Sequence, residues 1–172
     1  MQRRNEKTRT ASRVSVIWFN YGVIDVRTIA LRFSNKFAPA CGTIEAHNEL
    51  IREKGYVWYG KLGNKIAAGV FGVILENDEP RILLIHSGAT NRYWAYIDKI
   101  QYDIPEREDI PAYYRDDAEK FKTWFRVIKF EDAPRDIMSK CIVASSGQEL
   151  GIASKHSMSP YFKIIAPDPG EE

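Results

Sequence analysis

The sequence predicts an α+β domain built on a curved mixed sheet or small barrel of five or six short strands, flanked by a few helices. Three observations carry this prediction. The chain has 172 residues, which is the length of one domain. Hydrophobic residues make up 44% of it, enough to fill a core. Segments with strand patterns alternate with helical segments along its middle, separated by turn residues.

The strand predictions rest on β-branched, aromatic or alternating apolar residues. The predicted strands cover residues 14–19, 56–59, 82–87, 93–100, 123–130 and 160–165. Residues 82–87 form a largely apolar run and residues 93–100 alternate, with only a short turn between them. We therefore expect these two strands to be antiparallel neighbours.

One helix is predicted over residues 43–51, where Thr43 is a candidate N-cap and Gly55 ends the pattern. Residues 65–76 leave two alternatives open. Their apolar positions fit a helical stripe, but two glycines weaken a helix there.

The two ends differ in composition from the middle. Residues 1–13 are polar and basic, which indicates a frayed tail or a basic arm on nucleic acid. Residues 14–165 are expected to form a single domain. Residues 166–172, rich in proline and acidic residues, have the composition of a linker.

Charge and cysteine content exclude several classes of protein. Lysine and arginine number 25 against 23 aspartates and glutamates, which gives a net charge of +2 and excludes a polycation-like binder. Cys41 and Cys141 are too few for a disulfide framework or a four-cysteine zinc site. We expect no metal and no cofactor.

Membrane and export classes are also disfavoured. The longest uncharged run, residues 14–24, is shorter than the roughly 20 apolar residues of a membrane span. No small-residue cleavage site follows it, as a signal peptide would require. The expected location is the cytoplasm, with no membrane contact.

Catalytic patterns are weak, and we expect a protein that is not an enzyme. The three histidines are scattered: His86 lies in an apolar strand and is expected in the core, while His47 lies between glutamates and is expected on a solvated face. Residues 60–65 contain two glycines and two lysines but lack the Gly-Lys-Ser/Thr end of a phosphate loop.

The placement of aromatic residues is more informative. Trp58 and Tyr59 stand together at the end of a short strand, and Tyr113 and Tyr114 lie in the polar insertion 103–120. A packed core does not readily account for both tyrosines of that insertion. A strand-end tryptophan opposite a loop pair of tyrosines indicates a stacking site.

Several segments, in order, resemble the middle of a known domain. These are Gly55-Tyr56-Val57-Trp58, the strand at 82–87, the aromatic strand that begins at Tyr93, and Phe121-Lys122-Thr123-Trp124. Upstream, Val16-Ile17-Trp18-Phe19-Asn20 resembles a first strand that ends in Ser-Asn. Together they resemble YTH domains, which belong to the PUA-like group with the EVE domains.

The resemblance implies a reader of a modified base, with N6-methyladenine as the best guess and DNA favoured over RNA, which flips the base into an aromatic cage. It places Trp58 at one wall, Tyr59 beside it, Asn20 at the end of the first strand, and Tyr113 or Tyr114 at the second wall. Trp18, Tyr21 and Ser87 complete the candidate cage. Candidate phosphate contacts are Lys61, Lys65 and Arg92.

The resemblance also implies a context. Similar domains stand at the N-terminus of McrB-like restriction GTPases, so we expect the targeting domain of a larger restriction or defence protein, fused to a further domain such as an AAA+ GTPase. Two alternatives remain open. One is an RNA-binding module of the same group. The other is a reader of methylammonium groups or peptides, in which Asp116 or Asp117 would supply the acid.

Overall fold

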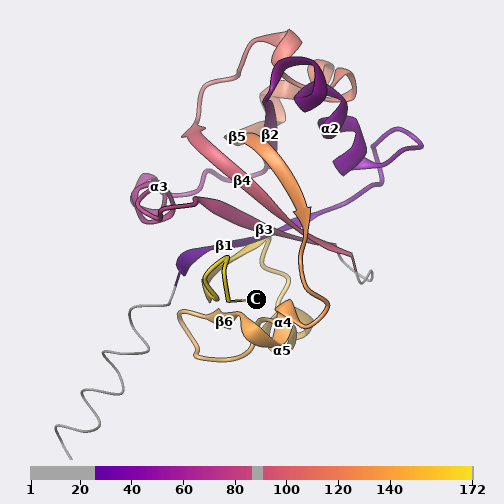
Figure 1. The fold of residues 1–172 in the computed structure, drawn as a ribbon. Helices are drawn as coiled ribbons and strands as arrows, with labels where there is room; N and C mark the ends of the chain where they lie inside the picture. Colours follow the sequence, from indigo (N-terminus) through magenta and orange to yellow (C-terminus); the bar gives the residue numbers. More distant parts are fainter. Residues whose placement is uncertain (1–25, 87–90, 172) are drawn as a thin grey trace, which may run out of the picture.

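The computed structural model describes residues 26–86 and 91–171, which form a curved, open sheet of seven strands (Figure 1). The strands are β1 (Val26–Phe33), β2 (Val57–Leu62), β3 (Arg81–His86), β4 (Arg92–Gln101), β5 (Phe121–Asp132), β6 (Ile142–Val143) and β7 (Tyr161–Ala166). Their order in the sheet is β2-β5-β4-β3-β1-β7-β6. β1 pairs with β3 in parallel, and the other neighbouring strands are antiparallel. The fold is therefore α+β, as predicted, with an open sheet rather than a closed barrel.

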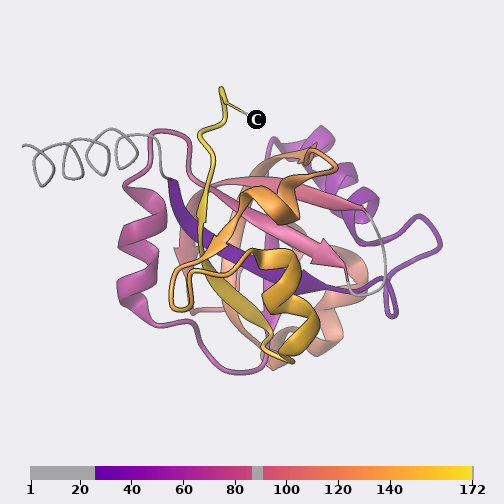
Figure 2. The same cartoon turned by 90° about the horizontal axis from the view of Figure 1, so that it is seen from below.

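Helices cover both faces of the sheet. They are α2 (Thr43–Lys54), α3 (Ala68–Leu75), α4 (Ile137–Lys140) and α5 (Leu150–His156), with 3-10 segments η1 (Arg107–Asp109) and η2 (Ala112–Lys120). Figure 1 shows α2 at one end of the molecule and α4 and α5 at the other, and Figure 2 shows α4 and α5 lying across the sheet. Among the described helices, none is long and apolar enough to cross a membrane.

Three groups of buried side chains make up the core. The largest includes Ile29, Leu31, Ile82 and Phe125, and α2 and α3 pack over it. A second lies under α4 and α5 and contains Trp94. The third surrounds Trp58 and Trp124, beneath η2. Burial of these apolar side chains is the main stabilising contribution to the fold.

Several of the predicted elements are confirmed. β3 and β4 are antiparallel neighbours, with Leu83 opposite Trp94. α2 begins at Thr43 and ends at Gly55, whose φ of 85° is the left-handed conformation that glycine adopts at helix ends. The N-cap position is held by Gly42 rather than Thr43, because the Thr43 hydroxyl instead donates a hydrogen bond to the Ser34 carbonyl.

Other elements differ from the predictions. The strand expected at 14–19 lies outside the described residues, as do the tail 1–13 and the turn 87–90. β1, at 26–33, was not predicted, although it lies inside the sheet between β3 and β7. Residues 68–75 form a helix in spite of their two glycines. The insertion 103–120 is not a plain polar loop, because Ile110 and Ala118 are buried within it.

Candidate functional site

Trp58 is buried rather than partly exposed. Its strand, β2, is an edge of the sheet and pairs only with β5. The η2 segment folds over this edge, so that Trp58 is only 5% exposed and packs in one cluster with Tyr114 and Trp124. Tyr114, expected as the second wall, therefore belongs to the same buried cluster as Trp58, and neither side chain is exposed to a base from solvent.

The two neighbouring tyrosines of η2 differ in their surroundings. The ring of Tyr114 is buried, with its centroid 4.5 Å from that of Phe121 and 4.6 Å from that of Tyr113. Burial raises the pKa of Tyr114 well above its usual value, so the phenol is neutral at physiological pH. Tyr113 is partly exposed. The core thus accounts for Tyr114, contrary to the expectation from the sequence.

A hollow of about 290 Å³ opens beside these tyrosines, between the end of β1, the strand β2 and η2. It is lined by Leu31, Arg32, Phe33, Ser34, Phe37, Thr43, Tyr59, Gly60, Lys61, Leu62, Tyr114, Phe121 and Pro160. We call it the aromatic hollow. Its volume lies at the lower end of ligand pockets, which span about 300–1,000 Å³. Because side chains alternate along a strand, Tyr59 faces this hollow while Trp58 faces the other side of β2.

The charges at the aromatic hollow are all positive. Its lining holds two cations, Arg32 and Lys61, and no carboxylate. Arg32 donates hydrogen bonds to the carbonyls of Ser154, Ser157 and Ser159 at 2.7–2.9 Å. Burial lowers the pKa of Lys61, whose Nζ donates to the carbonyls of Leu62 and Asn64. These two cations are held by the backbone, and they create a positive potential at the hollow.

Gly60 allows the close approach of β2 to Phe121 in the wall of the hollow. A Cβ atom at this position would lie 2.7 Å from ring carbons of Phe121, well inside van der Waals contact. We expect Gly60→Ala to lower the free energy of unfolding by about 1–3 kcal/mol through overpacking, measured by urea denaturation. In Gly151→Ala, whose Cβ would meet its nearest atoms at 3.5 Å, no loss is expected. Equal stability of the two variants would contradict the prediction.

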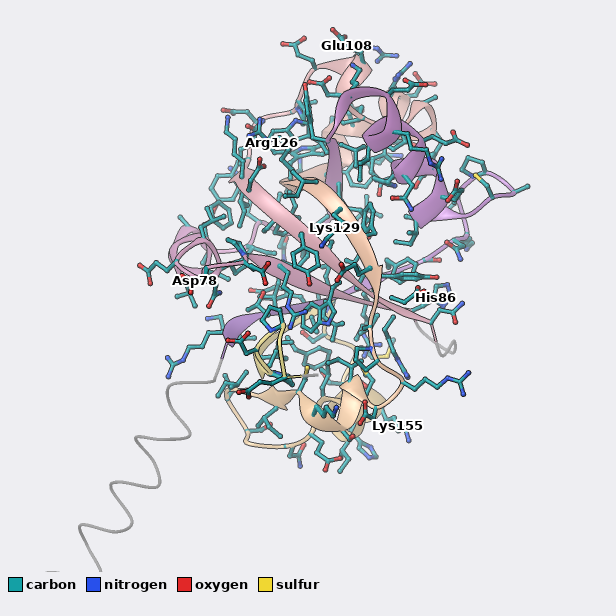
Figure 3. All side chains as sticks on the ribbon, in the orientation of Figure 1. Asp78, His86, Glu108, Arg126, Lys129 and Lys155 are labelled. Atoms are coloured by element: carbon teal, nitrogen blue, oxygen red, sulfur yellow. The ribbon has the colours of Figure 1, made fainter. Side chains whose placement is uncertain are left out.

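The remaining predicted site residues do not gather at the hollow. Lys65 is exposed, with its Nζ 4.7 Å from the Tyr102 ring centre. Arg92 is the strand partner of Ile85, next to His86. Trp58 is the strand partner of Arg126. Figure 3 shows His86 and Arg126 at opposite ends of the sheet, so Arg92 lies far from Trp58. The cation that lies near Trp58 is Lys99, at 5.9 Å from its ring. Trp18, Asn20, Tyr21 and Ser87 lie outside the described residues.

Sequence reasoning missed part of the hollow. Arg32, Phe33, Ser34, Phe37 and Phe121 all contribute to its lining. One signal was available, because Ser34 and Asn35 follow β1 directly and match the Ser-Asn step that the resemblance places after a first strand. Asn35 Oδ1 accepts a hydrogen bond from the Thr43 amide at 3.0 Å, which fixes the loop from β1 to α2 beside the hollow.

The histidine expectations were wrong in both cases. His86 is the last residue of β3 and is partly exposed, with its ring 5.1 Å from Phe33. His47, expected on a solvated face, is 0% exposed beneath Tyr59 and Tyr114. Its glutamate neighbours in the sequence lie on other faces of α2, because adjacent helical positions point in different directions.

Residues 29–164 match the Pua-like protein family. The chain belongs to the Pua-like family. The match spans β1 to β7 and so includes both the sheet and the aromatic hollow. No curated protein and no solved structure matches the sequence. The Pua-like assignment confirms the predicted superfamily and indicates a module of the nucleic-acid-binding type.

In the described part of this Pua-like domain, no group of three or more histidine, cysteine, aspartate or glutamate side chains is arranged so that it could hold a metal ion. Cys41 is exposed near the start of α2, and Cys141 is buried under α5. The aromatic hollow, with its rings and fixed cations, is therefore the candidate functional site.

Proposed function

We propose that this Pua-like domain binds nucleic acid and reads a modified base in the aromatic hollow, with N6-methyladenine in DNA as the first candidate. The observation that carries the proposal is the lining of the hollow, which combines aromatic rings with two cations and contains no carboxylate. An anionic polymer is attracted to such a site, and a flipped base finds apolar and aromatic surface within it.

The energies favour a site with more than one ring. Flipping a base out of the stack costs a few kcal/mol, and stacking on an aromatic side chain returns about 1–3 kcal/mol per base. Tyr59, Tyr114 and Phe121 line the hollow but are buried, with 4%, 7% and 8% of their surfaces exposed. Phe37 is 75% exposed and is the most exposed aromatic residue of the lining, with Lys36 Nζ 5.5 Å from its ring centre. We therefore assign Phe37 as the principal stacking residue.

The polar groups of the hollow suit a neutral base better than a phosphate. Arg32 and Lys61 already donate to backbone carbonyls, so reaching a phosphate would cost them those hydrogen bonds. The phosphates are then held by exposed lysines nearby, and Lys36, next to Phe37, is the first candidate. A buried methyl group adds only about 0.8 kcal/mol, so preference for the methylated base depends on a close fit.

The methylammonium alternative is disfavoured by the same lining. A cation reader requires an acidic or electron-rich cage free of positive charge, whereas this hollow holds two cations. Asp116 and Asp117 do not line it, and they are paired with Arg107 and Lys120.

The test is binding of a short DNA that contains one N6-methyladenine, measured by fluorescence anisotropy beside the unmethylated DNA and the matching RNA. Phe37→Ala is expected to weaken binding of the methylated DNA about 5- to 150-fold, since it removes one stacking contact. The matched control is Ile128→Ala, another exposed apolar side chain, which lines a different hollow near Asp98. Equal affinities of Phe37→Ala and Ile128→Ala for the methylated DNA would overturn the assignment of the aromatic hollow as the base-binding site. Tighter binding of the matching RNA would show that the domain reads RNA instead of DNA.

We also propose that the domain targets a larger restriction or defence protein through fusion to an AAA+ GTPase. The support is the resemblance of its ordered motifs to YTH and EVE domains. The protein encoded by the whole gene tests this, because a phosphate-loop motif beyond residue 172 would support the fusion. A gene that encodes no further domain would contradict it.

A further inference from the structure

Helix α3 has no polar side chain, although five of its eight residues are exposed. Its sequence is Ala-Gly-Val-Phe-Gly-Val-Ile-Leu over residues 68–75. Val70 and Ile74 are buried in the core, while Val73 is 43% exposed and Leu75 37% exposed on the outer side. A helix at the surface of a globular protein normally carries polar residues on its outer face. A helix that is apolar all round indicates that a further segment covers it.

A groove runs along the exposed side of α3. Its volume is about 390 Å³, and it lies between α3, the first residues of β1 and the strand β7. Gly69 lines it, and the space around a Cβ atom built on Gly69 is empty to 4 Å. The small residues of α3 thus leave room for side chains from another segment.

We propose that residues 14–24 of the same chain cover this groove and the outer face of α3. These eleven residues, Val-Ser-Val-Ile-Trp-Phe-Asn-Tyr-Gly-Val-Ile, contain no charge and consist mainly of aliphatic and aromatic side chains. Asp25 alone separates them from β1, and Arg27 and Thr28 of β1 line the groove. The segment therefore joins the described fold at the rim of the groove.

The segment is long enough to cover the helix. An eight-residue helix such as α3 is about 12 Å long, whereas eleven extended residues reach up to about 36 Å. Figures 1 and 2 both show α3 beside the first residues of β1. Arg27 and Lys163 stand in the lining of the groove, and their positive charge is opposite in sign to that of Asp25, the residue between the segment and β1. The proposal assigns Trp18 and Tyr21 to packing against α3, not to the base site.

Trp18 reports directly on this contact. The other three tryptophans, Trp58, Trp94 and Trp124, are buried in the core. Acrylamide quenching of the full-length chain, compared with Trp18→Phe, therefore isolates the signal of Trp18. We expect Trp18 to be protected from acrylamide in the unchanged protein. In Val73→Asp its quenching constant should rise towards that of free tryptophan amide, because the charge disrupts the apolar contact.

The matched control is Ile152→Asp, an equally exposed apolar position on α5, which should leave Trp18 protected. Free quenching of Trp18 in the unchanged protein would overturn the proposal, and so would quenching that Val73→Asp does not alter. Gel filtration tests the alternative that a second copy of the chain, rather than residues 14–24, covers α3. A dimer that Val73→Asp converts to a monomer would show that a second copy of the chain covers α3 instead.

Discussion

Replacing Trp58 with alanine is expected to lower the free energy of unfolding by about 3–5 kcal/mol, the largest effect we predict for a single substitution. The side chain is 5% exposed and lies among Ile110, Tyr114, Phe121 and Trp124. Its removal leaves a cavity beneath η2, the segment that closes the β2 edge. Urea denaturation measures the change, and each kcal/mol corresponds to a fall in melting temperature of about 2–4 °C for a domain of this size.

Trp58→Phe is the matched variant, because it keeps an aromatic ring in the cluster. Its loss of stability should be clearly smaller than that of the alanine variant, since less apolar volume is removed. A Trp58→Ala protein as stable as the unchanged domain would contradict the burial of this residue. Unfolding must be followed by circular dichroism as well as fluorescence, because the substitution removes a fluorophore.

The same pair of variants separates packing from binding. The aromatic hollow is lined by Tyr59 and not by Trp58, so we expect folded Trp58→Phe to keep its affinity for methylated DNA. Phe37→Ala should show the opposite pattern, with lost affinity and retained stability, because Phe37 is exposed. A stable Trp58→Phe protein that loses the preference for the methylated base would instead place Trp58 at the base.

Much of the sheet could be predicted from local patterns. β3 and β4 combine strong apolar runs with a short turn, so their pairing follows from the sequence alone. β1 was missed because polar residues interrupt its apolar positions. In the fold these residues find distant partners: the Thr28 hydroxyl donates to the Arg81 carbonyl, and Arg32 donates to carbonyls more than 120 positions away. Contacts at such separation leave no periodic signal in the sequence.

The sequence indicates which aromatic residues lie near the candidate site, but not which of them are exposed. Trp58, Tyr59 and Tyr114, which the sequence singles out, do lie near one another, with the Tyr59 and Tyr114 ring centroids 6.5 Å apart. All three are buried, and Trp58 and Tyr114 share their cluster with Ile110, just before η2, and with Ala118 within it. The burial of these residues by η2 results from tertiary packing, which local sequence patterns do not reveal. The exposed ring, Phe37, stands in a loop without a pattern, and only its place after β1 and Ser34-Asn35 marks it.

Acidification is expected to destabilise the domain through His47, by about 2 kcal/mol at pH 5 and about 3 kcal/mol at pH 4. Burial lowers the pKa of His47 from 6.5 to about 4, while its hydrogen bond to the Thr43 carbonyl opposes that shift. A carbonyl only accepts, so Nδ1 donates and Nε2 would have to take the added proton. Nε2 has no hydrogen-bond partner among the described residues. The rings around it belong to Tyr59, Tyr113, Tyr114 and Phe130.

The direction of the effect follows from proton binding. Between pH 6.5 and pH 4 the unfolded chain holds a proton on His47 that the folded chain does not, so acid favours unfolding across this window. Urea denaturation at pH 7.5, 5 and 4 measures the loss of stability. His47→Phe, which cannot titrate, should flatten the profile between pH 7.5 and 5, whereas His156→Gln, at an exposed position on α5, should leave it unchanged. An acid profile that His47→Phe does not alter would show that other groups cause the loss, and that the aromatic enclosure of His47 opens in solution.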